Sequence, residues 1–207
     1  MTVTEITEIS KSRRKIWIDE EFAFVLYSGE LKTYGIARDQ EMTEEAYHEI
    51  MTQLLPKRSK LRAMNLLQKR SYSVSQLRDK LVMGGYPAQV VQEAIEYVAS
   101  FNYVNDDSYA CDFIECSKEH KSKRRIFQDL GARGISGEIA ERAWEQMAGE
   151  DEEGLEREQI RRWIEKKHFS PETASPKEMR SMTAFLYRKG FTIDNIRSAL
   201  LLDITSI

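Results

Sequence analysis

The chain has 207 residues, of which 41% are hydrophobic and 31% charged, with a mean hydropathy of -0.55. This length can bury a core, but the charged fraction favours a high ratio of surface to interior. The net charge of -3 gives nucleic acid no general attraction, so any contact with a polyanion has to be local.

Cysteine usage and hydropathy bear on location. Cys111 and Cys116 offer no disulfide framework, so we expect a reducing, cytoplasmic environment. The first ten residues lack the apolar core of a secretory signal, and no apolar run approaches the roughly 20 residues of a membrane span. We therefore expect no membrane association.

The amino-terminal part is predicted to be a small β element. From Lys15 to Tyr27 apolar residues recur with a period near two, interrupted at Asp19–Glu21, which predicts two strands joined by a tight turn. The pattern also allows a third short strand over Leu31–Ile36. Because an isolated hairpin is marginal in water, we expect this sheet to cover the first helical repeat; the alternative is an arm that binds a partner.

A helix is predicted to open at Thr43 and to run through Leu54 and Leu55. It should stop near Pro56, because proline cannot donate the next backbone hydrogen bond.

Three later segments, residues 73–98, 122–147 and 178–203, align on their glycines. Large and small apolar positions recur in register, and the long glycine spacing suits three helices per unit. The matched sets are Leu77, Ile126 and Met182; Leu81, Leu130 and Leu186; Gly85, Gly134 and Gly190; Tyr86, Ile135 and Phe191; Ala94, Ala143 and Ala199; and Ile95, Trp144 and Leu200.

In the central unit, Asn105–Asp107 should start a helix, Gly134 should end the next, and Ser136 should cap the third. We thus predict a mainly α protein, with three tandem three-helix repeats in an elongated, curved array behind the β element. The expected segments are 1–42 (β element), 43–104, 105–149 and 150–207 (repeats one to three).

Residues Tyr103–Asp107, followed by Tyr109, Ala110 and Phe113, resemble the signature of the RecX family, regulators of the bacterial recombinase RecA. The likeness covers essentially the whole chain, since Ile18–Phe24 resembles longer members from Gram-positive bacteria. Further matching positions are Ala63, Leu66, Leu67, Arg70, Ser73, Leu77, Arg78, Leu81, Ile126, Leu130, Gly134, Ile135 and Leu186–Phe191.

The resemblance implies a non-catalytic, monomeric regulator. Such a protein would bind the groove of the RecA–DNA filament and modulate, mostly inhibit, ATP hydrolysis and strand exchange. Its contact with single- or double-stranded DNA would be weak or indirect, and no cofactor is implied.

Charge is unevenly distributed, with basic residues between positions 57 and 80 and again between 118 and 133, and acidic residues gathered at 138–158. Solvated helix faces would explain each block equally well. If the blocks instead bind a partner, our candidates for anionic or DNA-facing contacts are Arg58, Lys60, Arg62, Arg70, Lys121, Lys123, Arg124 and Arg125. Those for a basic recombinase surface are Glu150, Asp151, Glu152 and Glu153.

No catalytic or metal site is expected. His48, His120 and His168 lie in different units without metal-ligand spacing, and Gly84–Gly85 ends a helix instead of opening a phosphate loop. An enzyme would have to use Asp106 or Asp107, for which capping is the simpler role. The other alternative is a stand-alone DNA-binding protein built from helix-turn-helix-like modules, with tight, steeply salt-dependent binding.

Aromatic residues and one loop complete the expectations. Tyr103, Tyr109, Phe113, Phe127 and Trp144 have helical spacing, which favours core over base stacking. Trp163, between basic pairs, indicates a partly exposed basic surface. The loop Phe169–Pro176, with two prolines, should let the third aligned segment pivot and should be cut by proteases near Thr173, while Ser175 and Pro176 should start the next helix.

Overall fold

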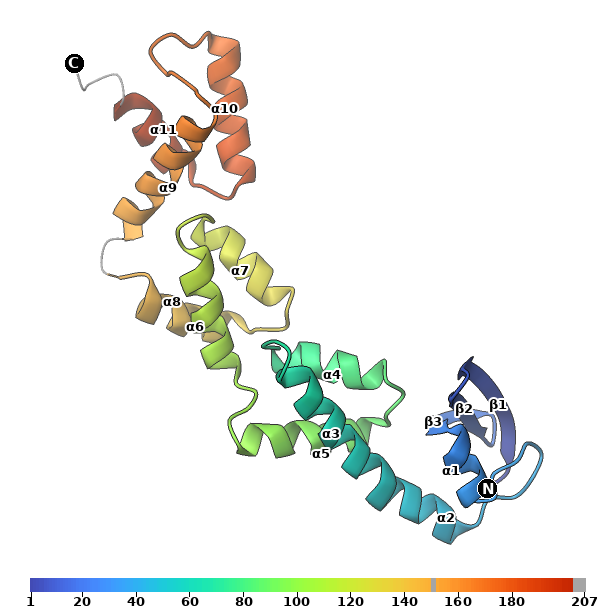
Figure 1. Ribbon diagram of the computed structural model, residues 1–207. Helices are drawn as coiled ribbons and strands as arrows, with labels where there is room; N and C mark the ends of the chain where they lie inside the picture. The colour runs from blue at the N-terminus through green and yellow to red at the C-terminus, as the bar shows by residue number, and fades with distance from the viewer. Residues whose placement is uncertain (150–151, 203–207) are drawn as a thin grey trace. The chain divides into compact units, whose positions relative to one another are not determined.

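A small antiparallel sheet and a series of short helices make up the computed structural model of the protein, which describes residues 1–149 and 152–202 (Figure 1). The chain divides into two compact units, Met1–Asn105 and Asp106–Ile207. Each unit contains two clusters of buried hydrophobic residues.

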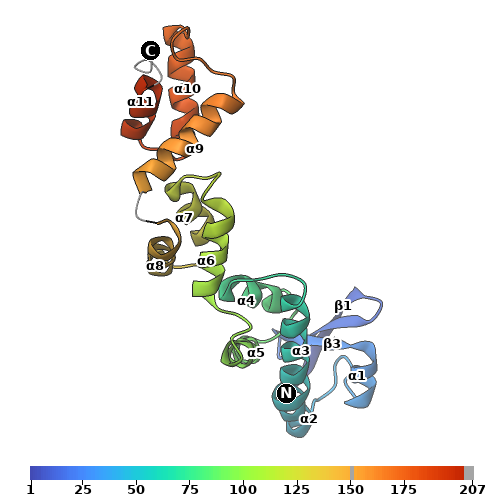
Figure 2. The same ribbon diagram turned by 60° about the vertical axis from the view of Figure 1, so that its left-hand side comes forward.

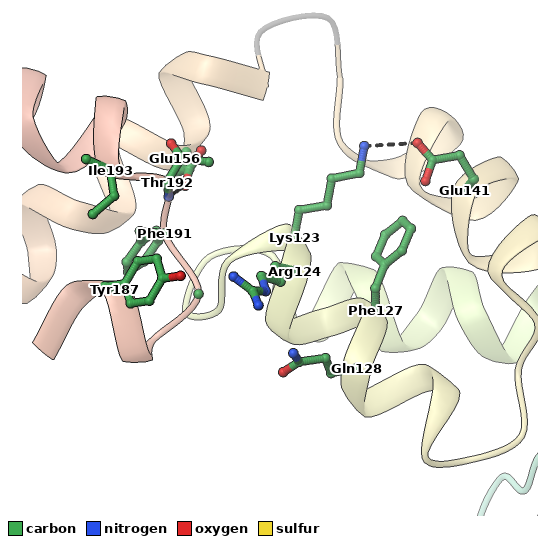
Figure 3. A pocket seen from close by; sticks show the side chains of 11 residues that line it. Lys123, Arg124, Phe127, Gln128, Glu141, Glu156, Tyr187, Phe191, Thr192 and Ile193 are labelled. Carbon is green, nitrogen blue, oxygen red and sulfur yellow. Dashed lines mark hydrogen bonds and ion pairs between the residues drawn. The ribbon is translucent and has the colours of Figure 1, made fainter. Parts of the chain in front are cut away.

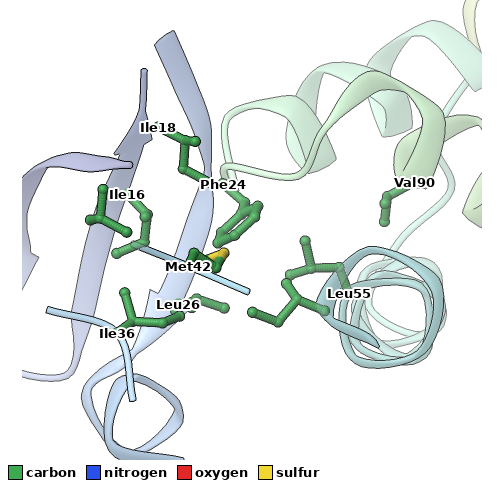
Figure 4. Packing of buried hydrophobic residues seen from close by; sticks show 10 residues of the cluster. Ile16, Ile18, Phe24, Leu26, Ile36, Met42, Leu55 and Val90 are labelled. Atoms are coloured by element: carbon green, nitrogen blue, oxygen red, sulfur yellow. The ribbon is translucent and has the colours of Figure 1, made fainter. Parts of the chain in front are cut away.

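The sheet contains β1 (Val3–Ser10), β2 (Arg13–Ile18) and β3 (Glu21–Tyr27) in the order β1-β2-β3. The predicted hairpin is confirmed: β2 pairs with β3, and Asp19 and Glu20 between them have φ of 49° and 70°, the left-handed values that tight hairpin turns use. The sheet covers the first helical repeat, as expected. Phe24 and Leu26 of β3 pack with Leu55 and Val90 of that repeat (Figure 4).

The third strand was predicted in the wrong place. It is β1, whereas residues 31–33 belong to the helix α1 (Ser28–Thr33) and residues 34–36 follow it. Register shifts between Val3 and Glu5 and again between Glu8 and Ser10 break the period-two alternation of β1, so no strand signal is visible in the sequence. In α1 the Glu30 carboxylate accepts the backbone N–H of Tyr27 at 2.6 Å, which favours a helix start.

The prediction that a helix stops near Pro56 is also wrong. Helix α2 (Glu44–Glu49) continues through the π-helical turn η1 (Ile50–Leu54) into α3 (Leu55–Leu67), with Pro56 in its first turn. The N–H of Leu55 donates to the carbonyl of Ile50, five residues back. This wider turn makes room for the proline ring, and the first turn of a new helical register needs no donor from Pro56.

The three predicted three-helix repeats are confirmed (Figure 1 and Figure 2). The first contains α3, α4 (Val74–Val82) and α5 (Ala88–Ser100). The second contains α6 (Asp106–Ser117), α7 (Lys123–Gly131) and α8 (Gly137–Met147). The third contains α9 (Glu152–Lys166), α10 (Pro176–Arg188) and α11 (Ile193–Leu202).

Equivalent positions have equivalent surroundings. Leu81, Leu130 and Leu186 are fully buried, each in the apolar cluster of its own repeat. The glycines that follow them, Gly85, Gly134 and Gly190, have φ of 86°, 80° and 96°, a conformation that side chains other than glycine rarely adopt.

Serine caps open the middle helix of each repeat. The hydroxyls of Ser73, Ser122 and Ser175 accept backbone N–H groups three residues later, which confirms the helix start predicted at Ser175 and Pro176. Ser136 caps α8 in the same way, as predicted.

The loop at residues 169–176 does not separate two repeats. It joins α9 to α10, and Ile160 and Ile164 of α9 pack in one cluster with Met182 and Leu186 of α10. The prediction that the third aligned segment pivots there is therefore wrong, because the helix before the loop shares a core with the helices after it.

Candidate binding groove and basic surfaces

Arg58 is directed inward. Its side chain is 17% exposed, its Nη1 donates to both carboxylate oxygens of Glu30 at 3.0 and 2.8 Å, and its Nη2 donates to the carbonyl of Val25. The guanidinium also lies over the rings of Tyr27 and Tyr86. These contacts join α3 to the sheet and to α1, so Arg58 stabilises the first unit and has little capacity left for a partner.

The other three candidates of the first unit are more accessible. Arg62 and Arg70 are exposed and Lys60 is half-buried. The Arg70 guanidinium lies 4.3 Å from the centroid of the Tyr72 ring, and Lys60 Nζ lies 5.3 Å from that of Tyr97. A cation over an aromatic face keeps its charge, so both remain able to meet an anion.

In the second unit, Asp129 gathers cations around one carboxylate. Lys121 Nζ lies 2.8 Å from Oδ2 and Arg125 Nε lies 3.1 Å from Oδ1, while Arg133 donates to the Asp129 carbonyl. Burial raises the pKa of the Asp129 carboxyl, but the Lys121 hydrogen bond and the charges of the three cations outweigh it and leave that pKa below its ordinary value. The single Asp129 carboxylate therefore offsets one of these three positive charges.

A groove of about 820 Å³ lies between α7 and the turn that joins α10 to α11 (Figure 3). The predicted residues Lys123 and Arg124 line one wall with Phe127, and Tyr187 and Ile193 lie on the other. Further lining residues are Gln128, Glu141, Glu156, Gly190, Phe191 and Thr192.

Two carboxylates of the groove are engaged. Glu141 pairs with Lys123 at 3.0 Å, and Glu156 accepts the backbone N–H of Thr192 at 3.1 Å and the side-chain amide of Asn195. By contrast, within the described ranges 1–149 and 152–202 no carboxylate pairs with the exposed Arg124. The groove thus offers one uncommitted cation beside apolar surface from Tyr187 and Ile193, which are 49% and 37% exposed.

The two walls are held together by a contact that the sequence did not reveal. Ser122 Oγ donates to the carbonyl of Lys189 at 2.8 Å while it accepts the N–H of Arg125. A Cβ atom at Gly190 would lie 2.5 Å from that hydroxyl, so only glycine lets the turn approach α7 this closely. Elsewhere in this unit, the side-chain amide of Gln159 on α9 donates to the carbonyl of Lys118, directly after α6.

The side chains of the four acidic candidates lie outside the part of the chain that the structure describes. Glu150 and Asp151 lie outside the described residues. Glu152 and Glu153 begin α9, but their side chains are outside the described part as well.

The aromatic predictions are mostly confirmed, with one correction. Trp144 is buried, and Tyr109, Phe113 and Phe127 are half-buried against the same cluster. Tyr103, however, is 55% exposed, because it lies beyond the end of α5 and not on a helix face.

The predicted basic surface around Trp163 is confirmed. The ring is half-buried against Phe185, and Lys166 Nζ and Lys189 Nζ lie 5.3 and 4.6 Å from its centroid.

The described residues bear on two further features, metal ligands and long apolar helices. No group of three His, Cys, Asp or Glu side chains is placed to hold a metal ion there. Within the same ranges, every helix is too short or too polar to cross a bilayer.

Cys111 and Cys116 are free thiols on α6. Asp107, in the first turn of α6, pairs with Arg142 at 2.7 Å.

The fold defines a class, a protein of tandem three-helix domains. Two family models match this chain, the RecX first three-helix domain over residues 60–97 and the RecX third three-helix domain over residues 155–200. Regulatory protein RecX of Caldanaerobacter subterraneus subsp. tengcongensis is 33% identical over 97% of this chain and 98% of its own length. The chain therefore belongs to the RecX family.

Other relatives agree. Regulatory protein RecX of Bacillus subtilis is 26% identical, covering 94% of this chain and 75% of that protein. A crystal structure of regulatory protein RecX superposes with a TM-score of 0.61 over 95% of this chain and 97% of the other. The crystal structure of RecX from Lactobacillus salivarius superposes with a TM-score of 0.59 over 71% of this chain and 95% of the other. At 18% identity, both structures show a shared fold.

Proposed function

We propose that this protein is a non-catalytic regulator that binds the filament of RecA recombinase on DNA and inhibits its ATP hydrolysis and strand exchange. Membership of a family whose relatives carry the name regulatory protein supports this function. The observation that carries the binding role is the groove of the second unit, with Arg124 uncommitted beside Tyr187 and Ile193. Aromatic residues and arginine are enriched in the centres of protein interfaces.

The contact set we propose omits one of the candidates named from the sequence. Arg58 is left out because its guanidinium is engaged inside the first unit. For anionic or DNA-facing contacts we retain Lys60, Arg62, Arg70, Lys121, Lys123, Arg124 and Arg125, and for basic recombinase surface Glu150, Asp151, Glu152 and Glu153. Weak contacts from separate three-helix domains add up because they are tethered in one chain.

In this proposal the protein acts as a monomer in the cytoplasm and needs no cofactor. Its contact with DNA is weak or indirect when no filament is present. The free thiols of Cys111 and Cys116 are compatible with a reducing compartment.

The test is a titration of recombinase ATPase activity on single-stranded DNA with this protein. We expect inhibition at less than one molecule per recombinase protomer. Arg124→Ala should weaken inhibition about tenfold, the loss typical of a central interface residue. The matched control is Arg161→Ala on α9, an exposed cation outside the groove, which should inhibit like the unaltered protein.

Unchanged turnover at saturating protein would overturn the proposal. Tight binding to bare DNA with a steep loss at high salt would then favour a stand-alone DNA-binding protein. If Arg124→Ala and Arg161→Ala weakened inhibition equally, the groove would not be the surface that inhibits the recombinase.

A further inference from the structure

Three aromatic side chains of the first unit remain exposed side by side. Tyr97, Phe101 and Tyr103 are 37%, 54% and 55% exposed. The ring centroids of Tyr97 and Phe101 are 5.1 Å apart and nearly perpendicular, and those of Phe101 and Tyr103 are 5.6 Å apart with planes at 20°. Exposing a contiguous row of aromatic rings to water is unfavourable, so this surface is a candidate for binding.

The end of α5 holds these rings in place. Asn102 adopts a left-handed conformation with φ of 56°, its N–H donates to Ala99, and the N–H of Tyr103 donates to Val98 at 2.9 Å. The Asn105 side-chain amide donates to that of Asn102 at 2.9 Å, and Val104 is buried. The backbone that carries Phe101 and Tyr103 is therefore fixed before binding, which lowers the entropic cost of binding.

A cleft of about 330 Å³ adjoins the row at Tyr103. It is lined by Met64, Leu67, Gln68 and Tyr103. Met64 and Leu67 supply apolar surface, Tyr103 supplies a ring, and the exposed amide of Gln68 offers a donor and an acceptor. Such an amide is complementary to the edge of a nucleobase, and no carboxylate is among these lining residues.

Positive charge lies beside the cleft along α3. Lys60 Nζ is 5.3 Å from the Tyr97 ring, and Lys60, Met64 and Gln68 follow one another at four-residue spacing on one helix face. Lys57, three residues before Lys60, is exposed and extends this face. Cations next to aromatic rings match the phosphates and bases of an unpaired strand.

We propose that Tyr97, Phe101 and Tyr103 form a stacking platform for unpaired bases of single-stranded nucleic acid, with Gln68 at a base edge and Lys57 and Lys60 at phosphates. This inference does not rest on the proposed function, because it concerns bare strands without recombinase. A row of rings beside an amide cleft and lysines favours nucleic acid over an apolar protein segment, which would not need the cations.

The experiment measures binding of fluorescently labelled oligothymidylate by anisotropy, with a duplex of the same length for comparison. Phe101→Leu/Tyr103→Leu keeps the surface apolar but removes its aromatic faces. We expect it to weaken single-strand binding about tenfold or more, while duplex binding stays unchanged. The matched control, Phe22→Leu, alters a 41% exposed ring of the sheet in the same unit and should bind the strand like the unaltered protein.

Salt separates stacking from phosphate contacts. Stacking releases few counterions, so the double leucine variant should lose the same factor at low and at high salt. Lys57→Gln/Lys60→Gln should instead flatten the dependence of affinity on salt. Oligouridylate, measured alongside, distinguishes DNA from RNA, and a loss with either strand supports the platform.

Unchanged single-strand binding in the double leucine variant, with an unaltered thermal melt, would overturn the platform, as would an equal loss on duplex. If that variant binds the strand normally but no longer inhibits recombinase, the row is a protein-binding surface and the inference is wrong. Recombinase is absent from the binding assay, so failure of the filament proposal leaves this test intact.

Discussion

The basic windows of α3 and α7 look alike as strings of lysine and arginine, but their charges are used differently. On α7 and the turn before it, Lys121 and Arg125 share Asp129, and Lys123 pairs with Glu141. On α3, Lys60 lies over an aromatic ring and Arg62 is exposed, whereas Arg58 is enclosed beside Glu30. The number of cations in a window therefore does not give the charge that a partner meets; the nearby carboxylates decide it.

The largest expected effect concerns Arg58. Arg58→Ala should lower the free energy of unfolding by about 2 kcal/mol, because it leaves the half-buried Glu30 and the carbonyl of Val25 without their donor. Chemical denaturation measures the change. Its control, the exposed neighbour Arg62→Ala, should stay within about 0.5 kcal/mol. If both variants lost similar amounts of unfolding free energy, the contacts of Arg58 with Glu30 and Val25 would not stabilise the protein more than an exposed arginine does.

A smaller effect is expected at the carboxylate that gathers the α7 cations. Asp129→Asn should cost about 1 kcal/mol of stability, since the ion pairs with Lys121 and Arg125 are partly solvated. The same change frees positive charge, so binding to single-stranded DNA at low salt should strengthen. Weaker binding in the folded variant would contradict the idea that Asp129 reduces the positive charge that Lys121 and Arg125 present to a partner.

The pH dependence of that carboxylate gives a further prediction. Because the cations keep the pKa of Asp129 in the folded protein below its ordinary value of 3.8, its stabilising contribution is complete above that value. The contribution should disappear as the pH falls through 3.8 toward the lower, folded pKa. The stability difference between the unaltered protein and Asp129→Asn, followed by denaturation against pH, should narrow only in this acid range; narrowing near neutral pH would argue against the assignment.

The smallest effect is expected at Arg70. Arg70→Ala removes a cation from above the Tyr72 ring at an exposed site, so stability should fall by about 0.5 to 1 kcal/mol. Arg70→Lys, which retains the charge, should restore part of this loss. A thermal melt detects the difference, and a loss above about 2 kcal/mol would indicate a contact other than the ring.

Sequence reasoning succeeded where the cause is local. Glycine at Gly134 and serine at Ser136 determine a helix end and a helix start through their own backbone and side chain, and both were predicted. The repeat register was equally accessible, because it recurs three times. The segment boundaries at 42, 104 and 149 remain predictions.

It failed where distant residues decide the outcome. β1 is recognised as a strand only through its pairing with β2, and Pro56 is accommodated by a π-helical turn. The inward orientation of Arg58 depends on Glu30, twenty-eight positions earlier in the chain. In the groove, Lys123 and Arg124 were among the candidates, but Tyr187 and Ile193 were not. The repeat register had matched Gly190 with Gly85 and Gly134, and Phe191 with Tyr86 and Ile135, and these matches were the signals that pointed to the turn.

The Ser122 hydroxyl makes two hydrogen bonds. It accepts the N–H of Arg125 in the first turn of α7 and donates to the carbonyl of Lys189 in the turn before α11. Fraying of that first turn therefore releases the far wall as well, so local melting and widening of the groove are a single thermodynamic event. An aspartate at this position would still accept the N–H of Arg125 and cap α7, but an ionised carboxylate cannot donate to the carbonyl of Lys189. Ser122→Asp should therefore keep the helix cap and lose the contact between the two walls of the groove.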